Sequence, residues 1–279
     1  MSAPADRSSD KQAGILLDVV IPVYNEEAIL RENAERLARY LDQVIGKGAW
    51  RFIFIDNGSQ DRTRAIIHEL IGEFGAGLYV HESEPNYGRA LRAGLKAASS
   101  PYVHTCDIEQ WDIPFLAWAW SMREKHDYFV GSRRSDPTIS KPPFVRRFLS
   151  WGLNALIQLF FSYMGTDTHG PKLFNLARLR PIIDICVCDR GQFDSEIVLR
   201  AVRAGLRIAE APIAHAEHRP PRFAIVKKIG WNIVAFTRLN GVLSKVPYTG
   251  MVNFHQFSRS DVLEVYDRVT GKTDVSAVA

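Results

Sequence analysis

The feature that most constrains the fold is an alternation between short apolar runs and longer segments in which apolar residues recur at helical spacing. The run LLDVVIPVY at 16–24 has the length of a strand and is apolar at almost every position, and a segment with helical spacing follows it. Strands that are apolar on both faces and alternate with helices are typical of a parallel sheet covered on both sides. The pattern therefore predicts an α/β protein.

The same two signals recur along the first half of the chain. We expect strands at 16–24, 50–56, 77–82, 102–107 and 127–132, and helices at 25–45, 61–74, 89–98 and 113–125. A chain of 279 residues is long enough for one large α/β domain or two small ones. We expect a disordered polar leader at 1–14, one domain at 15–247, and a C-terminal tail at 248–279 that covers the domain or extends from it.

Composition narrows the range of partners and compartments. The formal charge of +4 is too small to indicate nucleic-acid binding, but it is compatible with phosphorylated ligands or an anionic membrane surface. Three cysteines without a CxxC or a Cys/His ligand set favour neither a disulfide framework nor a zinc site, so a reducing cytoplasm fits best. The polar N-terminus has no apolar segment typical of a secretory signal.

Several predicted strands end in polar residues. In parallel sheets with helices on both faces, ligands bind beyond the carboxyl ends of the strands. Each polar pair alone could be a solvated turn, but their recurrence at one edge of the sheet favours a binding site. The pairs are Asn25 and Glu26, Asp56 and Asn57, Asp107 and Glu109, and Ser132 and Arg133.

The strand at 102–107 runs into three carboxylates within six positions, Asp107, Glu109 and Asp112. This cluster is either a solvated turn or a site for a hard cation, which prefers oxygen ligands. Asp112 directly precedes Ile113 and Pro114, so the cap of the following helix is its more ordinary interpretation, and a spare metal ligand is the alternative.

The chain resembles family-2 glycosyltransferases of the GT-A fold, most closely the dolichol-phosphate mannose synthase branch, over about 17–228. The resemblance is carried by VVIPVYNEE, IFIDNGSQDRT, NYGRALRAGLKAA and TCDIEQ, and continues in GSRR, DTHGPKLFN, FDSEIVLRAVRAGLRIAEAPI and RFAIVKK. It implies a single domain with a Rossmann-like, mostly parallel sheet, divided into a nucleotide-sugar half at 15–131 and an acceptor half at 132–247. It also implies an inverting, metal-dependent transfer of a sugar from a nucleotide-diphosphate donor to a polyprenyl phosphate.

On the donor side, the resemblance assigns Asp56 to the edge of the nucleotide base and places Pro22, Tyr24 and Glu26 on the other side of the nucleotide. Asp107 and Glu109 stand where the family usually has Asp-x-Asp, so they are expected to hold Mg²⁺ or Mn²⁺ against the diphosphate, with Asp107 contacting both. Glu109 keeps the charge on a longer arm. The NYGRALRAG loop is shorter than the commoner form, which leaves the donor sugar open.

On the acceptor side, a lipid phosphate is already an anion and needs no general base, so cations matter more. Arg133 can hold a phosphate through forked donors, and with Asp107 and Glu109 it is also a candidate for catalysis. The other acceptor or phosphate contacts that we expect are Arg134, His169, Lys172, Arg222 and Lys228, with Asp167 beside them. Asp194 and Glu196 open a helix of the family's FDxE type, and Glu196 is as well suited to pair with a nearby arginine.

Two apolar segments indicate contact with a membrane surface. The run at 148–166 has no charge, but motifs on both sides of it argue against a membrane span. The segment at 227–245 mixes Trp231, Phe236 and aliphatic residues with basic side chains. Either is a buried helix or lies in the membrane interface, and we expect a peripheral protein at the cytoplasmic face.

Two other functions remain open from the sequence. One is a glycosyltransferase with a soluble or saccharide acceptor, which would need a general base. The other is a nucleotide-sugar-binding protein without turnover.

Overall fold

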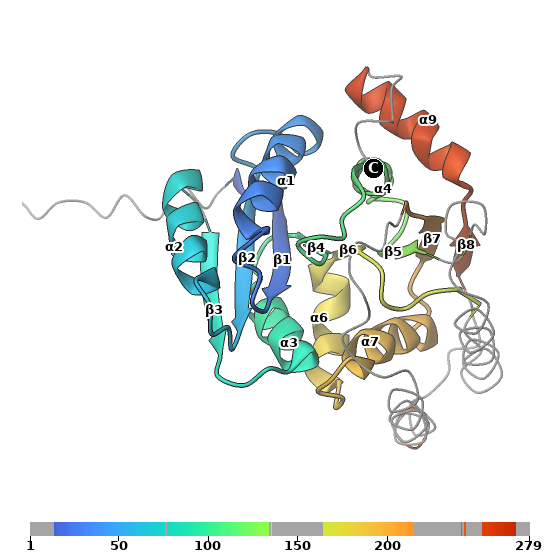
Figure 1. Ribbon diagram of the computed structural model, residues 1–279. Helices are drawn as coiled ribbons and strands as arrows, with labels where there is room; N and C mark the ends of the chain where they lie inside the picture. Colours follow the sequence, from blue (N-terminus) through green and yellow to red (C-terminus); the bar gives the residue numbers. More distant parts are fainter. Residues whose placement is uncertain are drawn as a thin grey trace, which may run out of the picture.

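A computed structural model describes residues 14–75, 77–133, 135, 164–214, 241, 243 and 253–271. These residues build one eight-stranded sheet in the order β3-β2-β1-β4-β6-β5-β7-β8 (Figure 1). The strands are β1 (Leu17–Val23), β2 (Trp50–Asn57), β3 (Gly77–Glu82), β4 (Tyr102–Thr105), β5 (Tyr128–Ser132), β6 (Lys172–Asn175), β7 (Ile208–Pro212) and β8 (Phe254–Gln256).

The sheet is mostly parallel, as predicted for this fold class. β1 pairs in parallel with β2 and β4, β2 with β3, β5 with β7, and β7 with β8. β6 is the exception, because it lies between β4 and β5 and is antiparallel to both. The sequence analysis did not predict β6, since its four residues, KLFN, are too few to show a period.

Helices cover both faces of the sheet (Figure 1). The contacts place α1 (Leu30–Val44), α2 (Thr63–Phe74), α4 (Ile113–Ser121) and α9 (Arg259–Thr270) on one face, and α3 (Tyr87–Ala97), α6 (Leu176–Ile185) and α7 (Gln192–Arg203) on the other. Successive residues of β1 explain why its sequence is apolar throughout. Val19 and Ile21 pack in the core on the α1 face, and Val20 between them packs on the α3 face, because side chains alternate across a strand.

The first helix begins at Leu30, so the predicted start at residue 25 is wrong. Asn25 has a φ of 53°, in the left-handed region that a helix does not use. Its amide donates to Ser59 Oγ and its side-chain oxygen accepts from the Gln60 amide, and these contacts hold it in a loop outside the helix.

The segment at 253–271 adds an edge strand and a helix to the domain. β8 pairs with β7, and α9 packs on α4 with Val262 and Tyr266 fully buried. α9 starts with a capping box, in which Ser258 and Asp261 satisfy each other's backbone amides. This helix is therefore fixed by its own cap and by apolar contacts.

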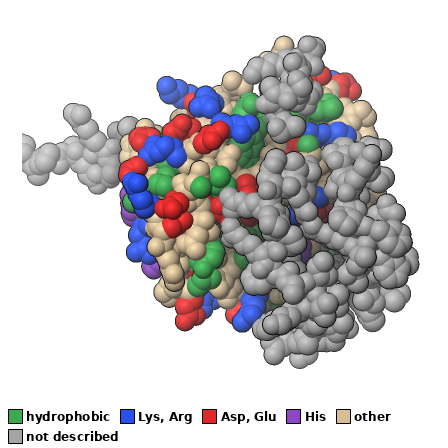
Figure 2. All heavy atoms as spheres, viewed as in Figure 1, with side chains coloured by type: hydrophobic (Ala, Val, Ile, Leu, Met, Phe, Trp, Pro, Cys, Tyr) green, Lys and Arg blue, Asp and Glu red, His purple; other side chains and the backbone are tan. Residues whose placement is uncertain are grey.

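The face of the molecule drawn in Figure 2 mixes Lys and Arg with Asp and Glu over its described part. One exposed network joins α1 to α2, where Arg31 lies 2.5 Å from a Glu69 carboxylate oxygen and 2.8 Å from one of Glu73. Exposed pairs of this kind add little to stability.

Among the residues that the structure describes, no helix combines the length and apolar character that a membrane crossing requires. Of the two segments expected at a membrane surface, only 164–166, Gly241 and Leu243 fall within the described residues. The rest of 148–166 and of 227–245 lies outside them.

His104 makes the stability of the fold depend on pH. It is buried in β4, where Nδ1 donates to the Lys172 carbonyl of β6 at 2.9 Å, and burial lowers its pKa from 6.5 to about 4. Because the folded pKa lies below the unfolded value, neutral His104 stabilises the fold above pH 6.5, and this contribution is lost as the pH falls toward 4. The loss reaches about 3 kcal/mol.

Urea denaturation at a series of pH values measures this loss. His104→Asn keeps a donor near the Nδ1 position. We expect its free energy of unfolding to fall less between pH 6.5 and pH 4 than that of the wild type. His68→Asn, at an exposed position on α2, should keep the wild-type dependence. Equal slopes for wild type and His104→Asn would contradict the assignment.

Candidate active site

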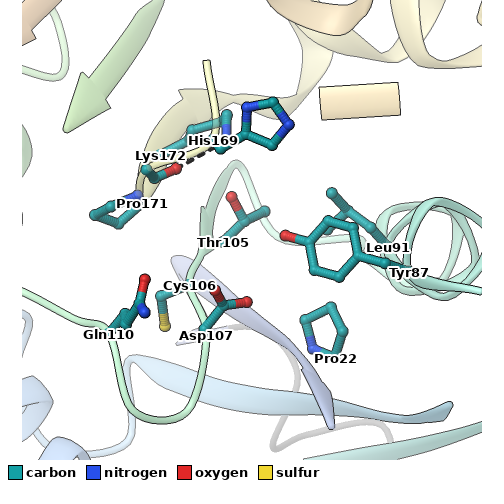
Figure 3. A pocket seen from close by; sticks show the side chains of 11 residues that line it. Pro22, Tyr87, Leu91, Thr105, Cys106, Asp107, Gln110, His169, Pro171 and Lys172 are labelled. Carbon is teal, nitrogen blue, oxygen red and sulfur yellow. Dashed lines mark hydrogen bonds between the residues drawn. The ribbon is translucent and has the colours of Figure 1, made fainter. Parts of the chain in front are cut away.

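A pocket opens at the carboxyl ends of β1 and β4, where the sequence analysis placed the site (Figure 3). Figure 3 shows the Asp107 carboxylate and the Tyr87 hydroxyl turned toward the same space. The pocket is lined by residues from β1, α3, the end of β4 and the segment entering β6: Pro22, Tyr87, Leu91, Thr105, Cys106, Asp107, Gln110, His169, Gly170, Pro171 and Lys172.

Asp107 is the half-buried acidic group of this pocket. Burial raises its pKa to about 6, the nearby Asp194 and Glu109 carboxylates add to the rise, and Arg133 and Lys172 oppose it. A carboxyl group with this pKa is mostly ionised at neutral pH and is stabilised by any cation that binds beside it. Glu109 lies two residues further on in the same turn, half-buried, and is not among the residues that line the pocket.

The turn that carries both carboxylates is held by local contacts. The Gln110 amide donates to the Asp107 carbonyl at 3.0 Å, and Trp111 Nε1 donates to the Ile108 carbonyl at 3.1 Å. The Trp111 ring also contacts α1, with its centroid 5.8 Å from that of Tyr40 and 5.4 Å from the Arg36 guanidinium carbon. The backbone between Asp107 and Trp111 is therefore fixed from two sides.

Asp112 caps α4, which confirms the more ordinary of its two interpretations. Its side chain accepts from the Phe115 amide at 2.7 Å, and Pro114 lies in the first turn of the helix. The other carboxylate oxygen accepts from the Ala214 amide at 2.8 Å. With both oxygens engaged inside the protein, Asp112 is not placed as a spare metal ligand.

The loops after β1 and β2 interlock beside the pocket. Besides the two Asn25 contacts described above, the Glu26 amide donates to Thr63 Oγ1 at 2.8 Å and the Glu27 amide to Asp61 Oδ2 at 3.2 Å. Tyr24 and Glu26 are half-buried on this double loop, and Pro22 just before it lines the pocket. The sequence analysis missed the interlocking, for which the only signal is the number of short polar side chains in both loops.

Asp56 is fully buried at the end of β2 and does not line the pocket. Its Oδ1 accepts from the Ser59 amide at 2.8 Å, and Oδ2 from Arg64 Nε at 3.1 Å and the Tyr79 hydroxyl at 3.3 Å. Although burial acts in the opposite direction, the contacts with Ser59 and Arg64 hold the pKa of Asp56 below its usual value. A nucleotide base that binds Asp56 would have to share its oxygens with Ser59, Arg64 and Tyr79, or displace one of them.

Two cations are each paired with a buried carboxylate: Lys172, which lines the pocket, and Arg133, which lies near Asp107 but does not line the pocket. Arg133 Nε lies 2.9 Å from Asp167 Oδ2, and Lys172 Nζ lies 3.1 Å from Asp194 Oδ1. Lys172 also donates to the Gly170 carbonyl at 2.8 Å, and the Tyr87 hydroxyl donates to Asp194 Oδ2 at 3.3 Å. Asp167 and Asp194 are therefore each ion-paired with a cation.

His169 is exposed at the edge of the pocket. Its backbone amide donates to Asp167 Oδ1 at 2.9 Å, and its Nδ1 lies 3.0 Å from Thr168 Oγ1. Three other predicted phosphate contacts, Arg134, Arg222 and Lys228, lie outside the described residues.

Glu196 is engaged with partners of its own. It pairs with Arg200 at 2.8 Å and accepts from the amides of Val187 and Cys188, at 2.9 and 2.7 Å. The predicted pairing with a nearby arginine is thus confirmed, and Glu196 holds the start of α7 against the preceding segment.

The sequence analysis also missed Tyr87 and Glu210. Burial and the Asp194 carboxylate raise the pKa of Tyr87, so its hydroxyl stays protonated at neutral pH. Glu210 in β7 accepts from the amides of Thr166 and Asp167, at 2.8 and 3.1 Å, and so fixes the loop that carries Asp167. A single Glu within a short apolar strand gives no sequence signal for this task.

The residues present fit a divalent cation that is shared with a phosphorylated ligand. Within the described part of the chain, no group of three or more His, Cys, Asp or Glu side chains forms a complete metal cage. Mg²⁺ is commonly bound by one or two carboxylates together with substrate phosphates, and Asp107 and Glu109 could supply such a pair.

Known proteins resemble this chain in sequence and in fold. The profile of "Glycosyl transferase family 2" matches residues 18–153. A dolichyl-phosphate beta-glucosyltransferase of Trichomonas vaginalis is 27% identical over 214 residues, which are 72% of this chain and 66% of that protein. A dodecaprenyl-phosphate galacturonate synthase of Rhizobium johnstonii is 29% identical over 160 residues, 55% of this chain and 46% of that protein.

Among solved structures, glucosyl-3-phosphoglycerate synthase of Mycobacterium tuberculosis in complex with UDP superposes with a TM-score of 0.59 at 18% identity. The match covers 83% of this chain and 82% of that one. The same enzyme in complex with Mn²⁺, UDP and phosphoglyceric acid gives a TM-score of 0.56 at 18% identity, over 86% of this chain and 82% of that one. At this identity the match shows the fold.

The fold and the matched family define the chain as a glycosyltransferase with the GT-A fold. More specifically, residues 18–153 match glycosyl transferase family 2, and the relatives in sequence include enzymes named for dolichyl-phosphate and dodecaprenyl-phosphate. The resemblance on which the sequence analysis relied is confirmed.

The buried Lys172–Asp194 pair predicts a strong effect on stability. Lys172→Met leaves Asp194 as a buried charge without its cation, and breaking such a pair costs about 3–5 kcal/mol of unfolding free energy. We expect the double variant Lys172→Met/Asp194→Asn to recover part of that loss in urea denaturation at pH 7.5, because the uncompensated charge is gone. A double variant no more stable than Lys172→Met would contradict the coupling.

Proposed function

We propose that the protein transfers a sugar from a nucleotide-diphosphate donor to a polyprenyl phosphate, with inversion at the anomeric carbon. One observation carries the choice of acceptor: the carboxylates across the pocket from the donor loops, Asp167 and Asp194, are ion-paired with Arg133 and Lys172. An acceptor hydroxyl needs a general base to remove its proton. Asp167 and Asp194 are poor candidates for that base, because each is already held in an ion pair. A phosphate is already an anion and is attracted to the two cations.

The donor side supports a nucleotide diphosphate. We infer that Asp56, with Pro22, Tyr24 and Glu26, binds the nucleoside, and that Asp107 contacts the diphosphate. Asp107 and Glu109 would hold Mg²⁺ or Mn²⁺. When bound, this cation neutralises the charge that develops on the departing diphosphate. The complex of Mn²⁺ and UDP with the synthase of the same fold supports this proposal.

Basic side chains would bind the phosphate of the acceptor. Arg133 uses Nε and Nη2 for Asp167, and among the described residues none contacts its Nη1, which can donate to a phosphate oxygen. Lys172 Nζ has three N–H donors, of which described residues take two. The remaining proposed contacts are His169, Arg134, Arg222 and Lys228. The names of the relatives, which refer to dolichyl-phosphate and dodecaprenyl-phosphate, support a lipid phosphate as the acceptor.

Because a polyprenyl phosphate resides in a membrane, an acceptor of this kind implies that the reaction takes place at a membrane surface. We propose peripheral binding at the cytoplasmic face through the uncharged segment at 148–166 and the basic, aromatic segment at 227–245. Attraction to anionic headgroups is worth about 1 kcal/mol per basic residue near the surface, so binding should weaken as salt is added.

The cation site is tested by Asp107→Asn. This change keeps the size of the side chain and removes one of two proposed ligands, so we expect affinity for UDP in the presence of Mn²⁺ to fall at least about tenfold, or about 1.4 kcal/mol. UDP affinity in EDTA should change little. Isothermal titration calorimetry gives both values, and Glu264→Gln, at an exposed position on α9, is the matched control.

Two results would count against this assignment. One is wild-type Mn²⁺ dependence in Asp107→Asn. The other is full transfer activity of the wild type in excess EDTA, which would show that no divalent cation is needed.

The proposed role of Arg133 in binding the acceptor phosphate is tested by Arg133→Gln. We expect transfer from a UDP-sugar to undecaprenyl phosphate to fall at least about tenfold, or about 1.4 kcal/mol, while UDP affinity with Mn²⁺ stays within about twofold, since Arg133 lies on the acceptor side. The donor for this assay is the UDP-sugar that raises the thermal unfolding midpoint most, because a ligand that binds the native state stabilises it. Arg268→Gln, at an exposed position on α9, is the control.

The same protein preparation tests the proposed binding to a membrane surface. The protein should sediment with vesicles containing anionic lipid at low ionic strength and be released by salt. If it stays in the supernatant at every salt concentration and transfers sugar to phosphate-free, water-soluble acceptors, the soluble-acceptor transferase is correct. Donor binding without transfer to any acceptor would instead indicate a binding protein without turnover.

A further inference from the structure

Asp112 joins the acidic turn to two distant parts of the chain. It ends the turn that carries Asp107 and Glu109 and begins α4, and it is only 3% exposed. Arg259, the first residue of α9, reaches it across 147 positions of sequence, with Nη1 2.8 Å from Asp112 Oδ2 and 3.0 Å from Oδ1. The Arg259 side chain is 14% exposed, so this ion pair is largely shielded from water.

The same arginine also holds the segment that leaves β7. Arg259 Nη1 donates to the Pro212 carbonyl at 3.1 Å, and the Ala214 amide donates to Asp112 Oδ2 at 2.8 Å. Asp112 and Arg259 therefore form a clamp that joins the acidic turn, the exit of β7 and the start of α9. The chain continues from this exit toward Arg222, one of the proposed phosphate contacts.

We propose that Arg259 is a positioning residue for cation-dependent binding of the nucleotide diphosphate. It acts through Asp112 and touches neither the cation nor the nucleotide. At the other end, the turn is attached to β4 through Asp107. Without Arg259, the buried Asp112 carboxylate lacks its neutralising partner, and an uncompensated buried charge is costly. The turn then relaxes, and the two carboxylates no longer share one fixed geometry.

Loss of the Arg259 side chain is not expected to unfold the domain, because other contacts hold α9 in place. Ser258 and Asp261 cap α9, and Val262 and Tyr266 pack on the core, independently of the Arg259 side chain. The helix is therefore expected to stay docked when that side chain is shortened. The turn also keeps the contacts of Trp111 with α1. The change should thus appear in cation affinity rather than in unfolding of the domain.

Calorimetric titration of UDP at a series of Mn²⁺ concentrations, and in EDTA, tests the proposal. For Arg259→Gln we expect the Mn²⁺ concentration for half-maximal enhancement of UDP binding to rise at least about fivefold, or about 1 kcal/mol. UDP affinity in EDTA should stay within about twofold. Arg259→Lys, which keeps the charge, should restore part of the Mn²⁺ dependence. Arg268→Gln on the same helix, which breaks an exposed pair with Glu264, should match the wild type.

A purely structural role gives a different result. It would lower UDP affinity in EDTA and in Mn²⁺ by the same factor, in step with the thermal midpoint, and would overturn the proposal. So would a wild-type Mn²⁺ dependence in Arg259→Gln. If that variant does not fold, Asp112→Asn, which keeps the shape of the cap, is judged by the same criterion.

The inference rests on the proposed function, and the experiment separates the two. If UDP binding by the wild type does not respond to Mn²⁺, the proposed cation site itself is wrong. If the wild type responds and Arg259→Gln responds equally, only the role of Arg259 is refuted.

Discussion

The pocket depends on how buried charges are compensated around Asp107. A carboxylate withdrawn from water is costly unless a cation stands beside it. The protein places two cations nearby, but Arg133 and Lys172 are each bound to a carboxylate of their own, Asp167 and Asp194. Burial and the nearby Asp194 carboxylate raise the pKa of Asp107 more than Arg133 and Lys172 lower it, so a further cation beside Asp107 would stabilise its charge. The same pairs leave donors that can face a phosphate, so one arrangement of charge accounts for both sides of the proposed reaction.

This arrangement relies on one strand that breaks the parallel pattern. β6 inserts between β4 and β5 in antiparallel orientation, so Lys172 at its start lies beside Thr105 at the end of β4. A parallel strand at this place would put its first residue at the opposite edge of the sheet. The loop before β6, which carries Asp167 and His169, is held in turn by Glu210 from β7. The proposed acceptor half of the site is thus fixed by strand order and by one buried carboxylate.

The sequence predicted those features that have a local signal. Apolar runs and helical spacing revealed the βα units, and the residues before Pro114 identified the cap at Asp112. The features that were missed depend on contacts between distant positions. β6 is too short for a period, Glu210 sits in an apolar strand, and Arg259 lies in a segment that was expected to be a tail. Asp56 was correctly placed at a strand end, but its contact with Arg64 arises only when α2 folds back on β2. Arg134, Arg222 and Lys228 lie outside the described residues and remain predictions.

The central claim is that the carboxylates at the end of β4 hold a divalent cation against a nucleotide diphosphate. Its most direct test is anomalous diffraction from crystals grown with UDP and Mn²⁺, because the anomalous signal of manganese locates the ion directly. We expect one strong peak within about 2.5 Å of an Asp107 carboxylate oxygen, between that side chain and the diphosphate. A UDP complex with no manganese at Asp107, or with the peak at another group of side chains, would contradict it.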